Sequence, residues 1–340
     1  MKLTILNSDL NIGIETTKDV TILDAALDAG IRLPFGCKSG ECGICKCELV
    51  SSSQIQEDIY DPLALSEKER SRGRILACVS RLTEDAIIRV QHQDLFDIET
   101  LSAQVTKIEK RNSNVIILHI LLDNNQIITY KPGQYIRLNF MNGVSRAYSI
   151  ASTNEKNELI FHIRYLNNGQ ASSFIYNQLS IGDKISIAGP FGNSYLRAEH
   201  DGPIIAICVG TGWAPIKSII ESSLSQNPSR IIKLLLKTRN FEEFYDKNDI
   251  KELSQNYRNF LCSIITESYG SFQQRVLKKQ VISNVNAYLQ KIGNIKVYIA
   301  GSYDLVENVK NALVTTNMNM DNFHSDVFFQ LPYTYKSKAA

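Results

Sequence analysis

Hydrophobic and polar residues follow three successive patterns along the chain. Residues 1–92 combine short apolar strands with one amphipathic helix and a loop rich in glycine and cysteine. A polar, acidic segment at 92–99 connects them to residues 99–200, in which short strand-like runs alternate with turn signals. In residues 201–335, near-continuous apolar runs alternate with helical stretches. The pattern therefore predicts a chain of three domains with these bounds.

The amphipathic helix of the first region is expected within residues 21–30. Thr21 and Asp24 have the spacing of a capping box, and Gly30 stands where the end of a helix favours a left-handed residue. Its apolar stripe consists of Leu23, Ala26 and Leu27. After the helix we expect strands over 45–50 and 86–90.

Turn signals such as Lys131-Pro132-Gly133 separate the apolar runs of the second region. Short strands at this spacing are typical of an antiparallel β-barrel. One helix is expected over Ser172–Leu179, and a tight turn over Gly189–Gly192 should end the barrel. The expected strands cover residues 103–109, 114–121, 134–140, 146–151, 158–165 and 184–188.

The third region has the pattern of an α/β nucleotide-binding domain. Its apolar runs are continuous because both faces of a parallel sheet are covered by helices. The expected parallel strands are Ile204–Val209, Ile231–Leu236, Phe260–Ile265 and Ile295–Ala300.

Composition and charge narrow the functional classes. Among 340 residues, 44% are hydrophobic and 21% charged, and the formal net charge is +2, which argues against a nucleic-acid binder. The apolar stretch 204–220 is interrupted by glycine, proline and lysine, so we expect a buried strand and helix there instead of a membrane span. No signal-peptide pattern opens the chain, which predicts a cytoplasmic location.

Four cysteines have the spacing of a plant-type [2Fe–2S] cluster. Cys37, Cys42 and Cys45 form C-x4-C-x2-C, and Cys78 follows at a distance. Glycines in the loop allow its backbone to approach the cluster sulfurs. A structural zinc site is the alternative, but zinc usually takes two C-x2–4-C pairs. The remaining thiols are interpreted as small buried hydrophobic residues: Cys47, Cys208 and Cys262.

The second region holds residues suited to a flavin. Alternation along a strand places Arg146 and Tyr148 on one face, where a cation and an aromatic ring suit a pyrophosphate and an isoalloxazine. Gly169 and Ser172 lie where a loop meets a helix N-terminus, which favours an anion. Taken alone, Arg146 and Tyr148 favour a surface arginine beside a core tyrosine, and the flavin interpretation depends on the neighbouring Gly169 and Ser172 loop.

In the third region, Gly210, Thr211 and Gly212 follow the first parallel strand and open a helix. Backbone at such a turn can approach a phosphate, although the loop departs from G-x-G-x-x-G and is also compatible with an ordinary glycine turn. Arg239 follows the second strand, where it reaches either a cofactor phosphate or solvent. Gly301 forms a further turn after a later strand.

In this order the motifs resemble the three-domain reductases that join a plant-type ferredoxin domain to a ferredoxin–NADP reductase-like module. That family includes reductases of naphthalene-type dioxygenases, phenol hydroxylase reductases and CDP-6-deoxy-glucoseen reductases. The resemblance implies a β-grasp ferredoxin domain, an FAD-binding β-barrel and an NAD(P)H-binding α/β domain. It also implies an oxidoreductase that carries electrons from NAD(P)H through FAD and the cluster to a protein acceptor.

The resemblance further implies individual roles. Tyr148 would stack on the flavin, Ser149 would lie near the hydride-accepting nitrogen, and Phe328, in Asp326-Val327-Phe328, would cover the other flavin face. The implied cluster ligands are Cys37, Cys42, Cys45 and Cys78. The implied phosphate and nucleotide contacts are Arg146, Gly169, Ser172, Gly210, Thr211, Gly212, Arg239 and Gly301.

Two residues depart from the family pattern. Ala300 replaces a cysteine common before the late glycine turn, and Trp213 replaces a smaller aliphatic residue, which is expected to narrow the nucleotide site. We expect an oxygenase component or its ferredoxin as the acceptor. A deoxysugar dehydrase is the alternative acceptor, and a redox-sensing protein of low turnover is the alternative from another class. NADH is expected to serve at least as well as NADPH.

Overall fold

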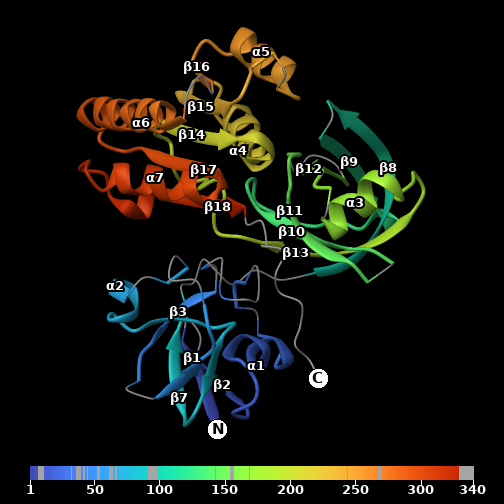
Figure 1. The fold of residues 1–340 in the computed structure, drawn as a ribbon, viewed down its shortest axis with the longest axis vertical. Helices are drawn as coiled ribbons and strands as arrows, with labels where there is room; N and C mark the ends of the chain where they lie inside the picture. The colour runs from blue at the N-terminus through green and yellow to red at the C-terminus, as the bar shows by residue number, and fades with distance from the viewer. Residues whose placement is uncertain are drawn as a thin grey trace.

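The structure is a computed structural model. It describes residues 1–6, 11–31, 33–35, 40, 43, 45–51, 54–60, 64–65, 67–90, 99–112, 114–141, 143–153, 157–167, 169–242, 244–266 and 270–328. The described strands form one large sheet in each of the three regions, and the first region also holds a two-stranded sheet. The three regions are distinct lobes of the ribbon (Figure 1).

The first region folds as a β-grasp. Among its described residues, five strands lie in the order β2-β1-β7-β3-β5, with β1 and β7 parallel and the other neighbours antiparallel. A small pair, β4 and β6, lies beside them. The elements are β1 (Lys2–Leu6), β2 (Asn11–Glu15), α1 (Ile22–Asp28), β3 (Lys46–Leu49), β4 (Ile55–Glu57), α2 (Glu67–Arg70), β5 (Arg74–Leu76), β6 (Ser80–Leu82) and β7 (Ala86–Arg89).

Helix α1 begins where its capping residue predicted. The Thr21 hydroxyl accepts a hydrogen bond from the Asp24 amide at 3.1 Å and donates one to the Asp24 carboxylate at 2.8 Å. Leu23 and Ala26 are buried in the domain core, and Gly30 ends the helix with a φ of 75°. The helix is therefore held by its cap at one end and by its apolar face against the sheet.

The second region is a closed antiparallel barrel, as expected. Six described strands lie in the order β11-β10-β13-β8-β9-β12, and a bridge between Ile150 and Phe161 joins the two ends of that order. The elements are β8 (Glu99–Arg111), β9 (Val115–Leu122), the 3-10 turn η2 (Asp123–Asn125), β10 (Tyr135–Asn139), β11 (Ser145–Ser149), β12 (Glu158–Arg164), α3 (Gln170–Asn177) and β13 (Lys184–Phe191).

The prediction of a tight turn over Gly189–Gly192 is wrong for residues 189–191. Strand β13 continues through this segment as far as Phe191, which pairs with Tyr135 of β10. The pairing shifts register between Tyr135 and Arg137, so the barrel accommodates the glycine and proline by an irregularity in the ladder instead of a turn.

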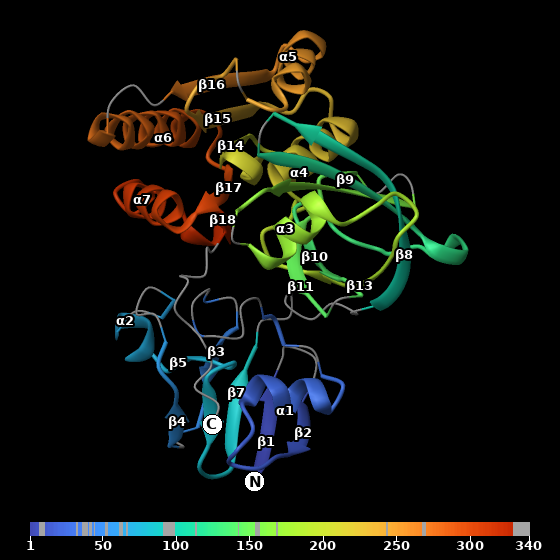
Figure 2. The same cartoon turned by 45° about the vertical axis from the view of Figure 1, so that its right-hand side comes forward.

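The third region is a parallel sheet with helices on both faces. Its described strands lie in the order β16-β15-β14-β17-β18. From β14 the chain adds β15 and β16 on one side of the sheet, and it then returns to add β17 and β18 on the other side of β14. Helices α4 and α5 pack on one face and α6 and α7 on the other, as Figure 2 shows. Such a switch point opens a crevice at the carboxyl ends of the strands.

The elements of this region agree with the apolar runs of the sequence. They are β14 (Ile204–Val209), the 3-10 turn η3 (Gly210–Gly212), α4 (Trp213–Gln226), β15 (Ile232–Thr238), α5 (Lys247–Asn256), β16 (Phe260–Thr266), α6 (Gly270–Ile292), β17 (Lys296–Ser302), α7 (Tyr303–Leu313), η4 (Met320–Asn322) and β18 (Phe323–Phe328). Among the described residues, no helix combines the length and the hydrophobicity that a membrane span needs.

The cap of α1 generates a stability prediction. Thr21→Ala removes the side-chain acceptor of the Asp24 amide, and loss of such a cap costs about 1 kcal/mol. Hydrogen exchange should show the opening free energy of the α1 amides lowered by about that amount. Thr17→Ala, at an exposed threonine that precedes the helix, is the control and should leave α1 unchanged.

Candidate redox and nucleotide site

Neighbouring strands of the ferredoxin domain bring two of the predicted cluster ligands together. Cys45 precedes β3 and Cys78 follows β5, and these strands pair with Lys46 opposite Leu76. The two Sγ atoms lie 3.3 Å apart and both residues are buried. This separation is far longer than a disulfide bond of about 2.05 Å and brings both sulfurs within reach of one metal atom. Cys37 and Cys42 lie outside the described residues.

The loop around these cysteines has the close packing that a cluster cradle needs. Gly40 has a φ of 74°, and a Cβ there would lie 2.7 Å from the Cβ of Tyr60. Gly43 has a φ of 67°, and its added Cβ would lie 2.7 Å from the Ala64 carbonyl oxygen. Both positions therefore require glycine, and the described part of the loop fits the iron–sulfur group that the cysteine spacing predicts.

The other thiols have a different environment. Cys47 and Cys208 are buried in hydrophobic cores, and burial raises the pKa of both thiols well above the ordinary value. Cys262 is half-buried, and burial raises its pKa to about 11. All three thiols therefore stay protonated near neutral pH, in agreement with their interpretation as small hydrophobic residues.

Strand β11 carries the three predicted flavin residues, with Arg146 and Tyr148 on one face and Ser149 on the other. Arg146 is exposed, Tyr148 is half-buried, and Ser149 is buried. Arg146 and Tyr148 alternate along the strand and so lie on one face. Burial raises the pKa of the Tyr148 phenol, which stays neutral. The face thus offers a cation next to an uncharged aromatic ring, which fits the phosphate and the ring system of a flavin.

Ser149 joins the barrel to the edge of the nucleotide domain. Its hydroxyl donates a hydrogen bond of 2.9 Å to the Asp326 carboxylate of β18. Desolvation raises the pKa of Asp326 to about 6, and the hydrogen bond from Ser149 opposes this rise. The contact places the end of β18, which includes Phe328, next to β11, and both views show these strands close together (Figures 1 and 2).

Gly169 and Ser172 shape the loop that opens α3. Gly169 is the N-cap residue, and a Cβ there would lie 2.5 Å from the Ser172 hydroxyl oxygen. That hydroxyl accepts a hydrogen bond from the Leu166 amide at 3.1 Å and is buried. Ser172 therefore ties the loop to itself, and the first-turn amides of α3 are the groups suited to an anion.

The predicted glycine turns meet at the switch point of the parallel sheet. Gly210, Thr211 and Gly212 form η3 directly after β14. A Cβ at Gly212 would lie 2.2 Å from the Ala300 carbonyl oxygen of β17, so this crossing requires glycine. A Cβ at Gly301 would lie 2.6 Å from the Cγ1 atom of Val209, so this position is also closely packed. The two strand ends are thus pressed together, with the N-terminus of α4 directly behind them.

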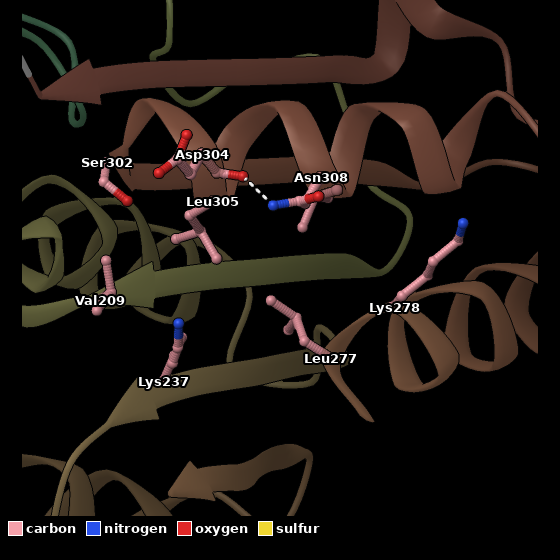
Figure 3. A pocket seen from close by; sticks show the side chains of 9 residues that line it. Val209, Lys237, Leu277, Lys278, Ser302, Asp304, Leu305 and Asn308 are labelled. Atoms are coloured by element: carbon pink, nitrogen blue, oxygen red, sulfur yellow. Dashed lines mark hydrogen bonds between the residues drawn. The ribbon is translucent and has the colours of Figure 1, made fainter. Parts of the chain in front are cut away.

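A pocket of about 140 Å³ opens at the carboxyl ends of β14, β15 and β17, between the sheet and helices α6 and α7. Figure 3 shows that its lining combines apolar side chains with charged ones. The polar lining residues are Lys237, Lys278, Ser302, Asp304 and Asn308. The Asn308 amide donates to the Asp304 carbonyl at 2.6 Å within α7. Arg239 is exposed just beyond Lys237, at the end of β15.

The two departures from the family pattern lie inside the domain. The Trp213 indole is fully buried, and its N–H donates to the Asp246 carboxylate at 2.7 Å. It packs in the core on the α4 side of the sheet and is not among the residues that line the described pocket. The Ala300 side chain is also buried, and its carbonyl forms the close contact with Gly212.

Sequence patterns did not predict which residues from distant segments of the chain lie together. Asp304, Lys278 and Asn308 reach the pocket from two helices, and no motif links them. Asp326 belongs to a recognised Asp-x-Phe, but its bond to Ser149 joins residues 177 positions apart. Contacts of this kind depend on how the domains pack and leave no local signal.

Family models match each region of the chain in turn. A 2Fe-2S iron-sulfur cluster binding domain matches residues 7–83, an oxidoreductase FAD-binding domain matches 102–195, and an oxidoreductase NAD-binding domain matches 206–311. The order and extent of these matches correspond to the three regions whose large sheets are described above.

Curated relatives match nearly the whole chain. The phenol hydroxylase P5 protein of Acinetobacter pittii is 30% identical over 327 residues, covering 93% of this chain and 91% of that protein. The CDP-6-deoxy-L-threo-D-glycero-4-hexulose-3-dehydrase reductase of Yersinia pestis is 31% identical, covering 93% and 96%. The reductase component of naphthalene 1,2-dioxygenase/salicylate 5-hydroxylase systems of Ralstonia is 26% identical, covering 94% and 97%.

Solved structures show the same fold. An Amycolatopsis cytochrome P450 reductase superposes with a TM-score of 0.72 at 24% identity, covering 96% of this chain and 98% of that one. The ferredoxin reductase of carbazole 1,9a-dioxygenase superposes with a TM-score of 0.67 at 22% identity, covering 97% and 99%. The chain belongs to the family of three-domain iron–sulfur flavoprotein reductases, NAD(P)H-dependent oxidoreductases that transfer electrons through FAD and a [2Fe–2S] cluster.

Proposed function

We propose that this reductase supplies single electrons to an oxygenase component or to its ferredoxin, with NADH serving at least as well as NADPH. FAD, when bound, supplies the conversion of a two-electron hydride donor into a one-electron donor. The chain itself holds the donor, flavin and cluster sites on three packed domains. The observation that carries the proposal is the meeting of β11, β18 and the glycine turns at one junction, through the bond from Ser149 to Asp326.

Each predicted residue has a role in this proposal. Arg146 neutralises a flavin phosphate, Tyr148 stacks on the ring from β11, and Phe328 approaches from the end of β18. The Ser149 hydroxyl is held by Asp326 beside them. Gly169 and Ser172 shape the α3 turn that receives the pyrophosphate. Cys45 and Cys78 bind the cluster from one side, and Cys37 and Cys42 complete its ligand set.

The pocket beside α7 is proposed to receive the adenosine end of the nicotinamide nucleotide. It lies at the switch point, next to Gly210, Thr211, Gly212 and Gly301, where parallel sheets of this kind bind dinucleotides. The Asp304 carboxylate accepts hydrogen bonds from the ribose hydroxyls and repels a 2′-phosphate. Lys237 and Arg239 reach the pyrophosphate from the end of β15. The Asp304 carboxylate supports the proposed preference for NADH, whereas the ammonium groups of Lys237 and Lys278 line the same pocket.

A deoxysugar dehydrase remains the second candidate acceptor, because the Yersinia pestis relative is as similar as the phenol hydroxylase protein. Purified candidate acceptors distinguish the two. An oxygenase component that is reduced at a rate matching turnover, with no reduction of a dehydrase, is expected. A cytoplasmic location is part of this proposal, since Cys47, Cys208 and Cys262 form no disulfide among the described residues.

Cys45→Ser tests the order of electron flow. Serine is a poor iron ligand beside thiolates, so iron and acid-labile sulfide should be lost, and cytochrome c reduction should fall by about tenfold or more. The flavin and nucleotide sites lie in other domains, so ferricyanide reduction should stay within about twofold of the wild type.

Cys47→Ala is the matched control, since Cys47 is a buried thiol of the same domain. It should keep its iron and both activities. Equal loss of ferricyanide and cytochrome c reduction in Cys45→Ser, with FAD still bound, would contradict the proposed order.

Ser149→Ala tests the environment of Asp326. The hydroxyl stabilises the charged carboxylate, so its removal should raise the pKa of Asp326 above about 6. Because the folded pKa exceeds the unfolded value, protonated Asp326 contributes stability at low pH, and this contribution is lost as the pH rises through about 6. Carboxyl NMR of flavin-free protein measures the shift.

Ser218→Ala is the control, because its hydroxyl donates to the Ser152 carbonyl. The pKa of Asp326 should be the same in this variant as in the wild type. A lowered pKa in Ser149→Ala would show that the hydroxyl does not stabilise the carboxylate.

Asp304→Lys tests nucleotide preference. Exchange of a carboxylate for an ammonium in the pocket should raise the ratio of kcat/KM for NADPH over NADH by about tenfold or more. Glu252→Lys, an equal charge change on exposed α5, should leave the ratio unchanged. A wild-type kcat/KM that favours NADPH by about tenfold would show the NADH preference to be wrong.

A further inference from the structure

An aromatic cluster joins the ferredoxin domain to the flavin barrel. Phe35 precedes the cysteine loop, whereas Tyr135 and Phe191 come from β10 and β13 of the barrel. Phe191 meets Phe35 edge to face at a centroid distance of 5.4 Å and stacks on Tyr135 at 5.6 Å. All three side chains are buried, and the two barrel residues belong to the same hydrophobic core as the ferredoxin domain.

One directional bond crosses this aromatic cluster. The Tyr135 hydroxyl donates a buried hydrogen bond of 2.6 Å to the carbonyl oxygen of Phe35. Phe35 lies two positions before Cys37, a proposed cluster ligand. The bond therefore fixes the backbone from which the cluster loop starts. Apolar packing alone would allow the loop to slide, because the hydrophobic effect has no preferred direction.

The backbone of Tyr135 pairs with β11, the strand of the proposed flavin site. In the ladder between β10 and β11, Tyr135 is the direct partner of Ser149. Directly opposed residues of antiparallel strands have Cα atoms about 4.5–5.5 Å apart. Tyr135 thus belongs by its backbone to the proposed flavin site and by its hydroxyl to the base of the cluster loop.

The Tyr135 ring has little freedom to leave this position. Phe191 stacks on it, and a Cβ at Gly192 would lie 2.9 Å from its Cδ1 atom, so the backbone there is in close contact with the ring. The Arg137 guanidinium lies 5.6 Å from the centroid of the Phe35 ring, on the same side of the junction. The barrel therefore presents a rigid donor to a loop of another domain.

We propose that Tyr135 is a positioning residue that clamps the start of the cluster loop to the flavin strand and so fixes the separation of the two redox centres. This rests on the proposed flavin and cluster sites. Transfer of an electron between two centres slows steeply as their separation grows. A clamp that keeps one short separation therefore speeds the step between flavin and cluster and leaves hydride transfer from the nicotinamide unaffected.

Tyr135→Phe in the full, cofactor-loaded protein tests the clamp, because it removes the hydroxyl and keeps the ring. Hydrogen exchange of the peptide that contains residues 33–35 should become about fivefold to tenfold faster, as expected for loss of one buried hydrogen bond. In stopped flow with NADH, flavin reduction should keep its rate, and cluster reduction should slow by a similar factor.

Tyr130→Phe is the matched control. Tyr130 is a buried tyrosine of the barrel. Its hydroxyl donates a hydrogen bond of 3.1 Å to the Ser152 carbonyl, so both partners belong to the barrel domain. It should change neither the exchange of residues 33–35 nor the rate of cluster reduction. Equal exchange and equal cluster reduction in Tyr135→Phe and the wild type would overturn the proposal, as would loss of FAD from Tyr135→Phe alone.

Failure of the underlying function has a different signature. Wild-type protein without iron, sulfide or FAD would contradict the proposed sites before any variant is compared. If Tyr135→Phe folds poorly, Arg137→Leu on the same strand removes the cation over Phe35 and keeps the Tyr135 hydroxyl. Exchange at residues 33–35 should then rise by about twofold or more, and unchanged exchange would count against the clamp.

Discussion

The arrangement of the three domains depends on one cross-strand pair of the barrel. Tyr135 and Ser149 lie directly opposite each other on β10 and β11. The Tyr135 hydroxyl reaches the ferredoxin domain at Phe35, and the Ser149 hydroxyl reaches the nucleotide domain at Asp326. Antiparallel pairing holds the two residues in fixed register, because a slip of one residue would exchange the faces of the strand. Both neighbouring domains are therefore hydrogen-bonded to the same cross-strand pair of the barrel.

A second contact between the barrel and the nucleotide domain is polar but uncharged. His162 of β12 shares a hydrogen bond of 2.9 Å with the Tyr245 hydroxyl. Burial is the main cause that lowers the pKa of His162 to about 3, so the ring stays neutral across the physiological range. This contact is insensitive to pH there, whereas Asp326, with its pKa of about 6, is a group at the junction that titrates close to neutrality.

Local sequence signals accounted for the elements and for residues that act through short spacings. The apolar runs of the third region predicted β14 to β17 because strands buried on both faces need continuous hydrophobicity. Thr21 and Asp24 predicted the start of α1, since a cap is made within one turn. The C-x4-C-x2-C spacing indicated the cluster, because three thiolates on one loop suit that ligation. The turn predicted over residues 189–192 was wrong, because glycine and proline also occur where the pairing of two strands is irregular.

The sequence by itself determined the three domains, their order and the residue types proposed to hold the cofactors, because spacing and periodicity are local properties. Only the tertiary structure decided that Trp213 packs in the core and does not line the pocket beside α7, since the acceptor of its indole N–H, Asp246, comes from a distant segment. It also decided that Ser149 meets Asp326 and that Tyr135 meets Phe35. These bonds form between domains, where desolvation makes a satisfied donor necessary and where no sequence period records which acceptor supplies it.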